Sequence, residues 1–365
     1  MHQILFEIPI PFTDRTVPIF GFGLMLLLAF VACALLARRL ARREGMNPDH
    51  ILDMGIWLFV GGIIGARILF MITYPVAGGW WDQVVHFFKI WEGGLIFYGS
   101  IAGGLVGYLF AYRAIIRPNG YSTLKLADIV APCIALGIFF GRLGCFLNGC
   151  CYGDLADPNQ VSWGMRFPAR SMPYQETTGR GYQTVYGFVL DGQEVRGVEA
   201  DAARAGLLPG DRIVQVGGQR ITGAHELHLA VSEWSLQDPL PVIVERQGKE
   251  YPVALPPPRS LPLHPTQLYS SLDGLLAFIL LMAYYPFRRR PGEVMALYMV
   301  CYAVNRYLIE QLRNDTPATY FGMLTMAQAI SLAVIVGAGV FWVWLRTRPR
   351  EPLPPPAAKT ATVAG

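Results

Sequence analysis

The chain has 365 residues, of which 53% are hydrophobic and 15% are charged, and its formal net charge is +4. The apolar residues lie in long blocks, which is the composition of a membrane protein and excludes a chain that is soluble throughout. The small net charge gives no reason to expect a nucleic-acid partner.

Seven apolar runs predict an all-α polytopic membrane core. A membrane-spanning helix needs about 20 mainly apolar residues. The runs lie near residues 18–37, 51–74, 93–116, 127–147, 267–286, 293–313 and 323–345. The first run lacks a basic segment before it and is followed by arginines rather than a small-residue cleavage site. We therefore interpret it as an uncleaved helix and not as a signal peptide.

Basic residues follow every second run and predict the orientation of the chain. They are Arg38, Arg39, Arg42 and Arg43, then Arg113, Arg117 and Lys125, then Arg288, Arg289 and Arg290, and last Arg346, Arg348 and Arg350. Short basic loops stay in the cytoplasm. The pattern therefore places the N-terminus and the stretch 148–266 outside and the C-terminus in the cytoplasm.

Three arginines lie within the apolar runs, where a charge is costly and is by default a candidate for function. They are Arg67, Arg142 and Arg306. Arg67 lies near the outer end of its run, so a structural role explains it equally well. Arg142 is flanked by glycines that allow close approach of a ligand or another backbone, and we interpret it as functional.

The sequence GRLGCFLNGCCYG, residues 141–153, contains three of the six cysteines. Three interpretations of Cys145, Cys150 and Cys151 are open: zinc ligands, a redox-labile vicinal pair, or small packing residues. Their spacing resembles no usual pair of zinc ligands, so we favour packing and predict no metal. The cysteines of the chain also do not form a disulfide framework.

Residues 182–258 have the composition of a soluble domain inserted between the fourth and fifth runs. Short β-type runs such as DRIVQVGG and LPVIVERQG alternate with turn signals and one helical run. The stretch from Ala200 to Leu227 resembles a bacterial periplasmic PDZ domain, which implies a small β/α domain that binds a peptide along a sheet edge. The implied peptide groove contains Tyr186, Gly187, Phe188 and Val189. A spacer without an open groove is the alternative.

A protease interpretation of the insert has no residues to support it. Zinc proteases of the relevant type carry two histidines four apart with a glutamate between them. Here His225 and His228 are three apart. The nucleophile turn GxSxG is also absent from the sequence.

The sixth run carries a polar stripe, because Tyr302, Arg306, Glu310 and Arg313 follow helical spacing along one face. An ordinary pairing of Glu310 with the two arginines explains part of it. Two arginines against one carboxylate leave an excess of positive charge. Because the planar guanidinium suits phosphate, a phospholipid headgroup is the ligand that we expect.

Together with WEGGLIFYGSIAGG and HPTQLY, the sequence GRLGCFLNGCCYG resembles the prolipoprotein diacylglyceryl transferase family of bacterial inner membranes. The resemblance covers the seven runs and excludes the insert and the tail. It implies transfer of the diacylglyceryl unit of phosphatidylglycerol to the lipobox cysteine of a preprolipoprotein, with release of glycerol 1-phosphate. The product is a thioether, and no cofactor is implied.

The resemblance also implies roles for individual residues. The catalytic residues would be Arg142, Arg306 and Tyr98. The substrate-binding residues would be Arg142, Asn148, Gly153, Gly99, His264, Gln267, Tyr302, Glu310 and Arg313.

The chain departs from the family pattern at several positions. Tyr98 stands where the family often has histidine, Cys145 where asparagine is common, and Cys150 where glutamate is common. A tyrosine with a pKa of about 10 is a poor base at neutral pH. Two sources of thiol activation therefore remain open: the field of the arginines, or another base such as His264.

These departures keep one alternative open, a protein that binds an anionic lipid and a peptide on the same scaffold without turnover. A transporter or channel is not favoured, since no internal repeat appears in the sequence. The predicted domains are 1–181 and 259–347 for the transferase core, 182–258 for the PDZ-like insert, and 348–365 for a disordered cytoplasmic tail.

Overall fold

The computed structural model describes residues 4–9, 16–74, 79–89, 94, 96–157, 161–169, 171–235, 238–313 and 324–350. The chain divides into two compact units. Unit 1 contains Met1–Leu26, Phe140–Leu272 and Arg306–Ala329, and unit 2 contains Leu27–Phe139, Asp273–Asn305 and Ile330–Gly365. Most of the predicted disordered tail, residues 351–365, lies outside the described residues.

Six helices in the described part of the chain are long and apolar enough to cross a membrane. They are α1 Gly21–Arg43, α2 Pro48–Thr73, α4 Phe97–Ala111 with the π-helical turn Tyr112–Ile116, α5 Thr123–Asn148, α9 Thr266–Tyr284 with the 3-10 turn Tyr285–Phe287, and α11 Met326–Arg346. The prediction of a mostly helical chain with several membrane spans is confirmed. Seven spans were predicted, and six helices qualify within the described residues.

The predicted sixth span, 293–313, is helical over α10 Glu293–Glu310. This helix has 18 residues and contains Glu293, Arg306 and Glu310. Its charged residues keep it out of the six helices that qualify by length and composition.

The N-terminal end of α10 in unit 2 is fixed by buried charges. The carboxylate of Asp128 accepts hydrogen bonds from the backbone N–H groups of Gly292 at 2.8 Å and Val294 at 3.0 Å. Arg288 is also buried and lies 2.5 Å from Glu44 and 3.6 Å from Asp128. Arg288 of the basic cluster after the fifth run is therefore paired inside the protein and does not project into solvent.

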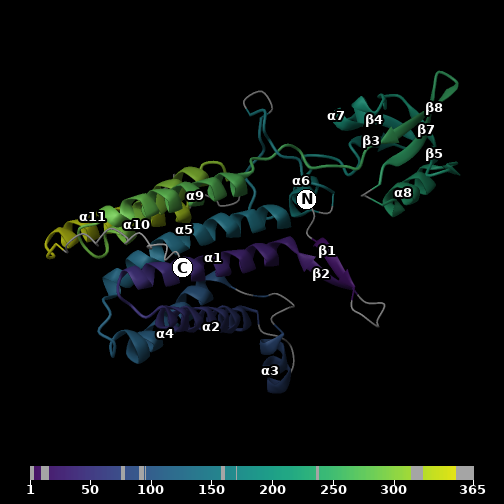
Figure 1. Cartoon of the computed structure of the whole chain (residues 1–365). Coiled ribbons are helices and arrows are strands. Elements are labelled where there is room, and N and C mark those ends of the chain that lie inside the picture. The colour runs from purple at the N-terminus through teal and green to yellow at the C-terminus, as the bar shows by residue number, and fades with distance from the viewer. Residues whose placement is uncertain are drawn as a thin grey trace, which may run out of the picture. The chain divides into compact units, whose positions relative to one another are not determined.

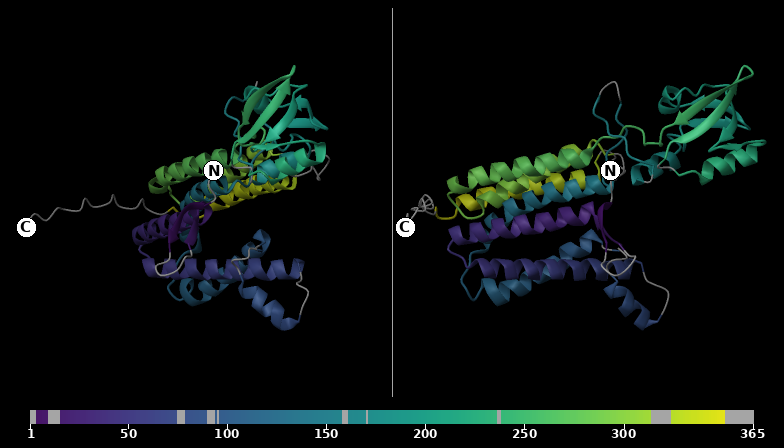
Figure 2. Two further views of the ribbon diagram at one scale, coloured as in Figure 1. Left: turned by 90° about the vertical axis from the view of Figure 1, so that its right-hand side faces the viewer. Right: turned by 45° about the vertical axis from the view of Figure 1, so that its right-hand side comes forward.

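Helices α2 and α4 lie side by side in unit 2 (Figures 1 and 2) and touch through glycines. A Cβ atom on Gly103 would lie 2.1 Å from the carbonyl oxygen of Gly61, and one on Gly99 would lie 2.4 Å from that of Gly65. Such small residues allow close packing in lipid, where helix association depends on van der Waals contact. Gly99 therefore has a packing reason to be glycine.

The short helix α3, Trp80–Phe88, was not predicted, and it explains Arg67. Arg67 is 1% exposed and donates to the carbonyl oxygens of Phe87 at 3.2 Å, Lys89 at 3.2 Å and His86. The last carbonyls of a helix lack partners within it. Arg67 supplies donors to them, so its buried charge has a structural role.

The N-terminal residues form an antiparallel hairpin that the all-α prediction missed. Its strands are β1 Ile4–Pro9 and β2 Thr16–Phe20. The Thr16 hydroxyl donates to the carboxylate of Glu7 at 2.9 Å.

The insert in unit 1 is an antiparallel sheet domain (Figure 1), as predicted. Its strands are β3 Phe188–Asp191, β4 Glu194–Val198, β5 Arg212–Val216, β6 Gln219–Arg220, β7 Leu240–Arg246 and β8 Lys249–Leu255. The sheet order is β3-β4-β5-β7-β8, with β6 paired to β5. Helices α7 Ala200–Arg204 and α8 Ala224–Glu233 belong to it, and its core includes Ile213, Leu227, Val242 and Val244.

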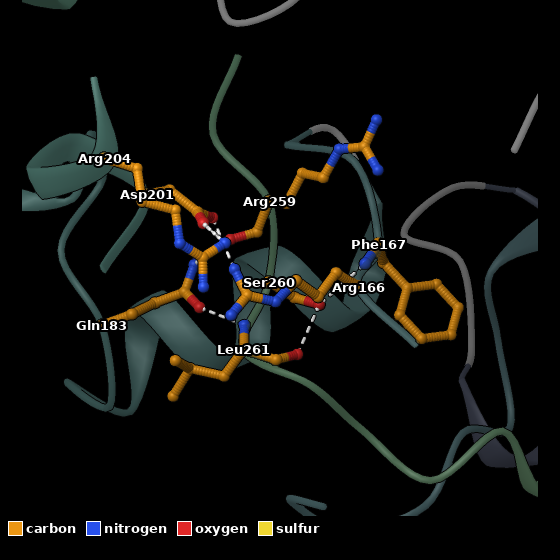
Figure 3. A network of polar contacts seen from close by, with 8 residues as sticks. All are labelled: Arg166, Phe167, Gln183, Asp201, Arg204, Arg259, Ser260 and Leu261. Atoms are coloured by element: carbon orange, nitrogen blue, oxygen red, sulfur yellow. Dashed lines mark hydrogen bonds and ion pairs between the residues drawn. The ribbon is translucent and has the colours of Figure 1, made fainter. Parts of the chain in front are cut away.

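The two segments that lead into and out of the sheet are tied together by buried polar groups (Figure 3). The side chain of Gln183 donates to the Arg259 carbonyl at 3.2 Å and accepts from the Leu261 N–H at 2.6 Å. The Ser260 hydroxyl accepts from the Phe167 N–H at 2.9 Å. Because Gln183 and Ser260 are almost fully buried, these bonds hold the base of the insert in place.

Candidate functional site

The candidate site lies in unit 1 at the end of α5. Arg142 lies near the end of this helix, and Asn148 is its last residue. Gly149 has φ +74, the left-handed conformation that commonly closes a helix. The Cys150 N–H then donates to the Cys145 carbonyl at 3.1 Å. The chain therefore turns sharply after Asn148.

The residues after this turn are paired with two distant segments. The Gly153 N–H donates to the His264 carbonyl at 2.8 Å, and the Asp154 N–H donates to the Leu312 carbonyl at 2.9 Å. A Cβ atom on Gly153 would lie 2.7 Å from the Leu312 oxygen and 2.8 Å from the His264 Cβ. The structure thus brings together Gly153 and His264, which the sequence predicted as site residues, and it leaves no room for a side chain at position 153.

The start of α9 holds the same loop from a second side. Gln267, another predicted site residue, is fully buried and donates to the Cys150 carbonyl at 2.8 Å. The neighbouring Thr266 hydroxyl donates to the Cys151 carbonyl at 2.9 Å. The Oε1 atom of Gln267 and the Nδ1 atom of His264 are buried, and neither has a hydrogen-bond partner within the described residues. The Oε1 atom of Gln267 is an acceptor, whereas the Nδ1 atom of His264 donates or accepts according to its tautomer.

The end of α10 supplies an ion pair. Arg306 lies 2.8 Å from the carboxylate of Glu310, whose side chain is fully buried. The Thr325 hydroxyl donates to the same carboxylate at 3.0 Å. The pair expected along the helix is therefore present, and Thr325 fixes it in a way that the sequence did not predict.

A cavity of about 250 Å³ adjoins these segments. It is lined by Cys150, Cys151, Tyr152, Gly153, Asp154, Leu155, Met172, Glu176, Thr177, Arg180, Tyr182, Leu263 and Arg313. Of the residues predicted for substrate binding, Gly153 and Arg313 reach its wall.

Several polar residues of the cavity wall were missed by the sequence analysis, among them Tyr152, Glu176 and Arg180. Glu176, on the short helix α6 Met172–Gly179, accepts from the Tyr152 hydroxyl and pairs with Arg180. The spacing of Glu176 and Arg180 is that of any exposed helical ion pair. Tyr152 belongs to the loop 149–154 that follows α5, which we call the signature loop. Only its contact with Glu176 makes Glu176 and Arg180 part of the site.

Two of the predicted site residues, Arg142 and Arg313, both affect the pKa of the Cys151 thiol. The neighbouring thiols of Cys145 and Cys150 lower the pKa of the Cys151 thiol, burial opposes them, and the charges of Arg142 and Arg313 lower it further. Both arginines therefore act on one point at the cavity wall. A positive field there favours any anion.

The predicted residues Tyr98, Gly99 and Tyr302 belong to unit 2. Tyr98 is 62% exposed at the start of α4, whereas Gly99 is buried against α2. Tyr302 is exposed and its ring stacks on Tyr298 with 6.0 Å between centroids. Gly99 therefore has a packing role.

The predicted peptide groove of the insert lies at an edge of its sheet, since β3 ends the strand order. Gly187 has φ +77, which glycine adopts at little cost, and its carbonyl accepts from the Glu199 N–H at 2.7 Å. The Tyr186 hydroxyl donates to the Val231 carbonyl of α8 at 2.7 Å. Phe188 points into the core, whereas Val189 is 47% exposed.

The model of the family described as prolipoprotein diacylglyceryl transferase matches residues 9–344. The chain belongs to the prolipoprotein diacylglyceryl transferase family. This confirms the family to which the three sequence motifs pointed.

Curated members named phosphatidylglycerol–prolipoprotein diacylglyceryl transferase are similar to this chain over most of its length. The protein from Rhodopirellula baltica is 28% identical over 363 residues, which cover 90% of this chain and 72% of that protein. The protein from Clostridium tetani is 27% identical over 347 residues, with 93% and 97% covered. The protein from Gloeobacter violaceus is 29% identical over 334 residues, with 90% and 88% covered.

Proposed function

We propose that this chain transfers the diacylglyceryl group of phosphatidylglycerol to the lipobox cysteine thiol of a preprolipoprotein. The observation that carries the proposal is the cavity beside the signature loop, with Arg313 in its wall and the charge of Arg142 acting at Cys151. This positive site suits a phosphate headgroup. The transfer is the first step of bacterial lipoprotein maturation.

In the reaction the substrate thiolate attacks a glyceryl carbon, so that a C–S bond forms and a C–O bond breaks. The electron pair of the broken bond goes to a phosphate oxygen, and glycerol 1-phosphate leaves. Fixed cations at the leaving oxygens stabilise the charge that develops there. We assign this role to Arg142 and Arg306, and the buried ion pair with Glu310 supports it because it holds the Arg306 guanidinium.

Other residues bind and orient the substrates. Asn148, His264 and Gln267 offer polar groups, and Arg313 offers charge. Gly153 shapes the site through backbone packing. Gly99, Tyr98 and Tyr302 are assigned to substrate binding by the family pattern, and Tyr98 takes the place of the histidine that the family often has there. An exposed phenol can orient a headgroup by hydrogen bonding.

The transferase core spans the bacterial inner membrane seven times, with α10 as the sixth span. The alternation of basic loops supports an outer N-terminus, an insert in the periplasm and a cytoplasmic C-terminus. Arg306 and Glu310 neutralise each other in α10, which reduces the cost of burying them in a membrane helix.

The insert is a PDZ-like domain that binds an extended peptide along β3, next to Val189. The position of β3 at the end of the sheet supports strand addition. Its peptide ligand belongs to a preprolipoprotein or to a partner that processes lipoproteins. To test this, residues 185–256 are replaced by a short Gly-Ser linker, which leaves the bonds of Gln183 to Arg259 and Leu261 intact.

The deletion variant should transfer lipid to a short lipobox peptide as the full chain does, and should be slower on full-length preprolipoproteins. Equal rates on every full-length substrate would contradict a role of the insert in recruitment.

The proposed roles of the arginines are tested with the purified chain, phosphatidylglycerol and a lipobox peptide. Arg142→Ala and Arg306→Ala should each lower the rate of glycerol phosphate release by about 100-fold to 1,000-fold, which is the usual cost of removing one donor to a developing anion. Arg212→Ala, in the insert, is the control and should keep the rate. If wild-type protein binds lipid but releases no product, the lipid-binding and peptide-binding alternative replaces the transferase.

A further inference from the structure

Three cysteine sulfurs meet beside the cavity. The sulfur atoms of Cys145, Cys150 and Cys151 all lie within 4.8 Å of one another. In a tetrahedral zinc site with Zn–S bonds of about 2.3 Å, the sulfurs are ~3.8 Å apart. Small rotations of the side chains therefore reach the geometry of a metal site. A disulfide would use only two of the three sulfurs.

The backbone at Cys151 adopts a conformation that costs free energy. Its φ is +60, and among the described residues other than glycine only Gln247 also has a positive φ. A residue with a side chain that is held in this region is strained and persists only where the surroundings fix it. Here the turn directs two adjacent side chains toward the sulfur of Cys145. Cysteines that served only as small packing residues would not require a positive φ at Cys151.

Buried side chains of α9 fix the backbone of both adjacent cysteines. Gln267 donates to the Cys150 carbonyl at 2.8 Å, and Thr266 donates to the Cys151 carbonyl at 2.9 Å. Both donors are at most 1% exposed. These bonds hold the main chain that carries the two adjacent thiols.

Cysteine thiolates select soft ions such as zinc over magnesium or calcium. The three sulfurs therefore indicate a thiophilic ion.

We propose that Cys145, Cys150 and Cys151 bind one thiophilic divalent ion, of which zinc is the representative, with its fourth coordination position open to the cavity. Cys150 and Cys151 line that cavity, and three protein ligands with one open position are typical of zinc sites that accept a substrate or water. The use of the open position rests on the proposed function, because it faces the cavity that receives the substrate thiol. A metal-bound thiol is deprotonated outright, which supplies the activation that Tyr98 cannot.

The test uses the full-length chain, reduced and freed of metal with a chelator, and cobalt as a spectroscopic probe of the zinc site. We expect one cobalt ion per chain, with sulfur-to-cobalt charge-transfer absorption and the visible bands of a tetrahedral ion, all lost when zinc is added. A small monothiol should change the visible bands without releasing the cobalt, because it occupies the open position.

Cys145→Ser and Cys151→Ser should each weaken cobalt binding by more than about 100-fold, since even the outer hydrogen bonds of a metal site are worth 10-fold to 100-fold. Cys301→Ser removes a half-buried thiol in α10 and should bind cobalt as the wild type does. A measurement on wild type alone guards against misfolded variants: zinc should slow alkylation of Cys150 and Cys151, and a chelator should restore it.

A fully reduced wild-type chain that takes up no cobalt would overturn the inference, as would unchanged uptake by the two variants. Because absorption and alkylation do not depend on turnover, a chain that binds cobalt but transfers no lipid refutes the proposed function and not the metal site.

Discussion

Two glycines that the family resemblance assigns to the substrate also have packing roles. Gly153 lies against the Leu312 carbonyl and the His264 side chain, and Gly99 lies against the Gly65 carbonyl. The sequence shows that both positions are glycine. It does not show why a side chain is excluded there, because the neighbouring atoms belong to segments more than 30 residues away in the chain. The joint place of Tyr152, Glu176 and Arg180 in the cavity wall also follows only from the fold.

Gly153→Ala should damage the site and the stability of unit 1 together. Its Cβ atom would lie 2.7 Å from both the Leu312 oxygen and the Thr266 Cγ2. Overpacking of this kind costs about 1–3 kcal/mol, and the loop would move away from α9. Thermal unfolding in detergent and the transfer rate should both fall. Gly141→Ala is the matched control, because nothing lies within 4 Å of its Cβ position; an equal effect of both changes would refute the packing argument.

At the scale of elements, hydropathy predicted the six long apolar helices because lipid requires each spanning segment to satisfy its own backbone. It did not predict α3 or the hairpin of β1 and β2, which are too short to give a periodic signal. In the insert, alternating apolar residues predicted strands at β5, β7 and β8. The strand β4, EVRGV, was missed because a glycine and two charged residues interrupt its apolar pattern.

The contact of α2 with α4 should depend on Gly103. A Cβ atom there would lie 2.1 Å from the Gly61 oxygen, so Gly103→Ala forces the helices apart. We expect a loss of about 1–3 kcal/mol in stability, measured as a lower unfolding temperature. Gly104→Ala should be neutral, because its Cβ position is 3.8 Å from the nearest atom. Stability that is unchanged in Gly103→Ala would show that the two backbones do not meet so closely.

The insert should lose stability in acid through Asp211. Hydrogen bonds from Arg246, at 2.6 Å and 2.7 Å, lower the pKa of this carboxyl from its usual value of 3.8, although burial opposes them. A lowered pKa means that the stabilisation is complete above pH 3.8 and is lost as the pH falls further. Hydrogen exchange of β5 and β7 amides in the full chain, corrected for intrinsic rates, should therefore accelerate below about pH 4.

Asp211→Asn should remove this acid sensitivity and accelerate exchange at neutral pH. Glu250→Gln breaks an exposed ion pair with Arg220 and should change neither, since exposed pairs contribute little. An acid response that persists in Asp211→Asn would assign it to another carboxyl.

At the scale of the whole molecule, the chain combines helices, six of them candidate membrane spans in the described part, with a sheet domain placed between α5 and α9. The sequence motifs predicted the family. The structure adds that distant segments hold the loop after α5. Helix α9 anchors Cys150 and Cys151, and the carbonyl of Leu312, just after α10, accepts from the Asp154 N–H. The apolar run 293–313 predicted α10 as a span, although its three charged residues keep it out of the six helices that qualify by composition. Of these residues, Arg306 and Glu310 form the ion pair that their helical spacing predicted.

The most direct test of the central claim is the mass of a lipobox peptide after incubation with the purified chain and phosphatidylglycerol. The account predicts a gain of one diacylglyceryl group on the peptide cysteine, with release of an equal amount of glycerol phosphate. A peptide with serine in place of that cysteine should gain nothing. An unchanged cysteine peptide, in the presence of bound lipid and folded protein, would contradict the account.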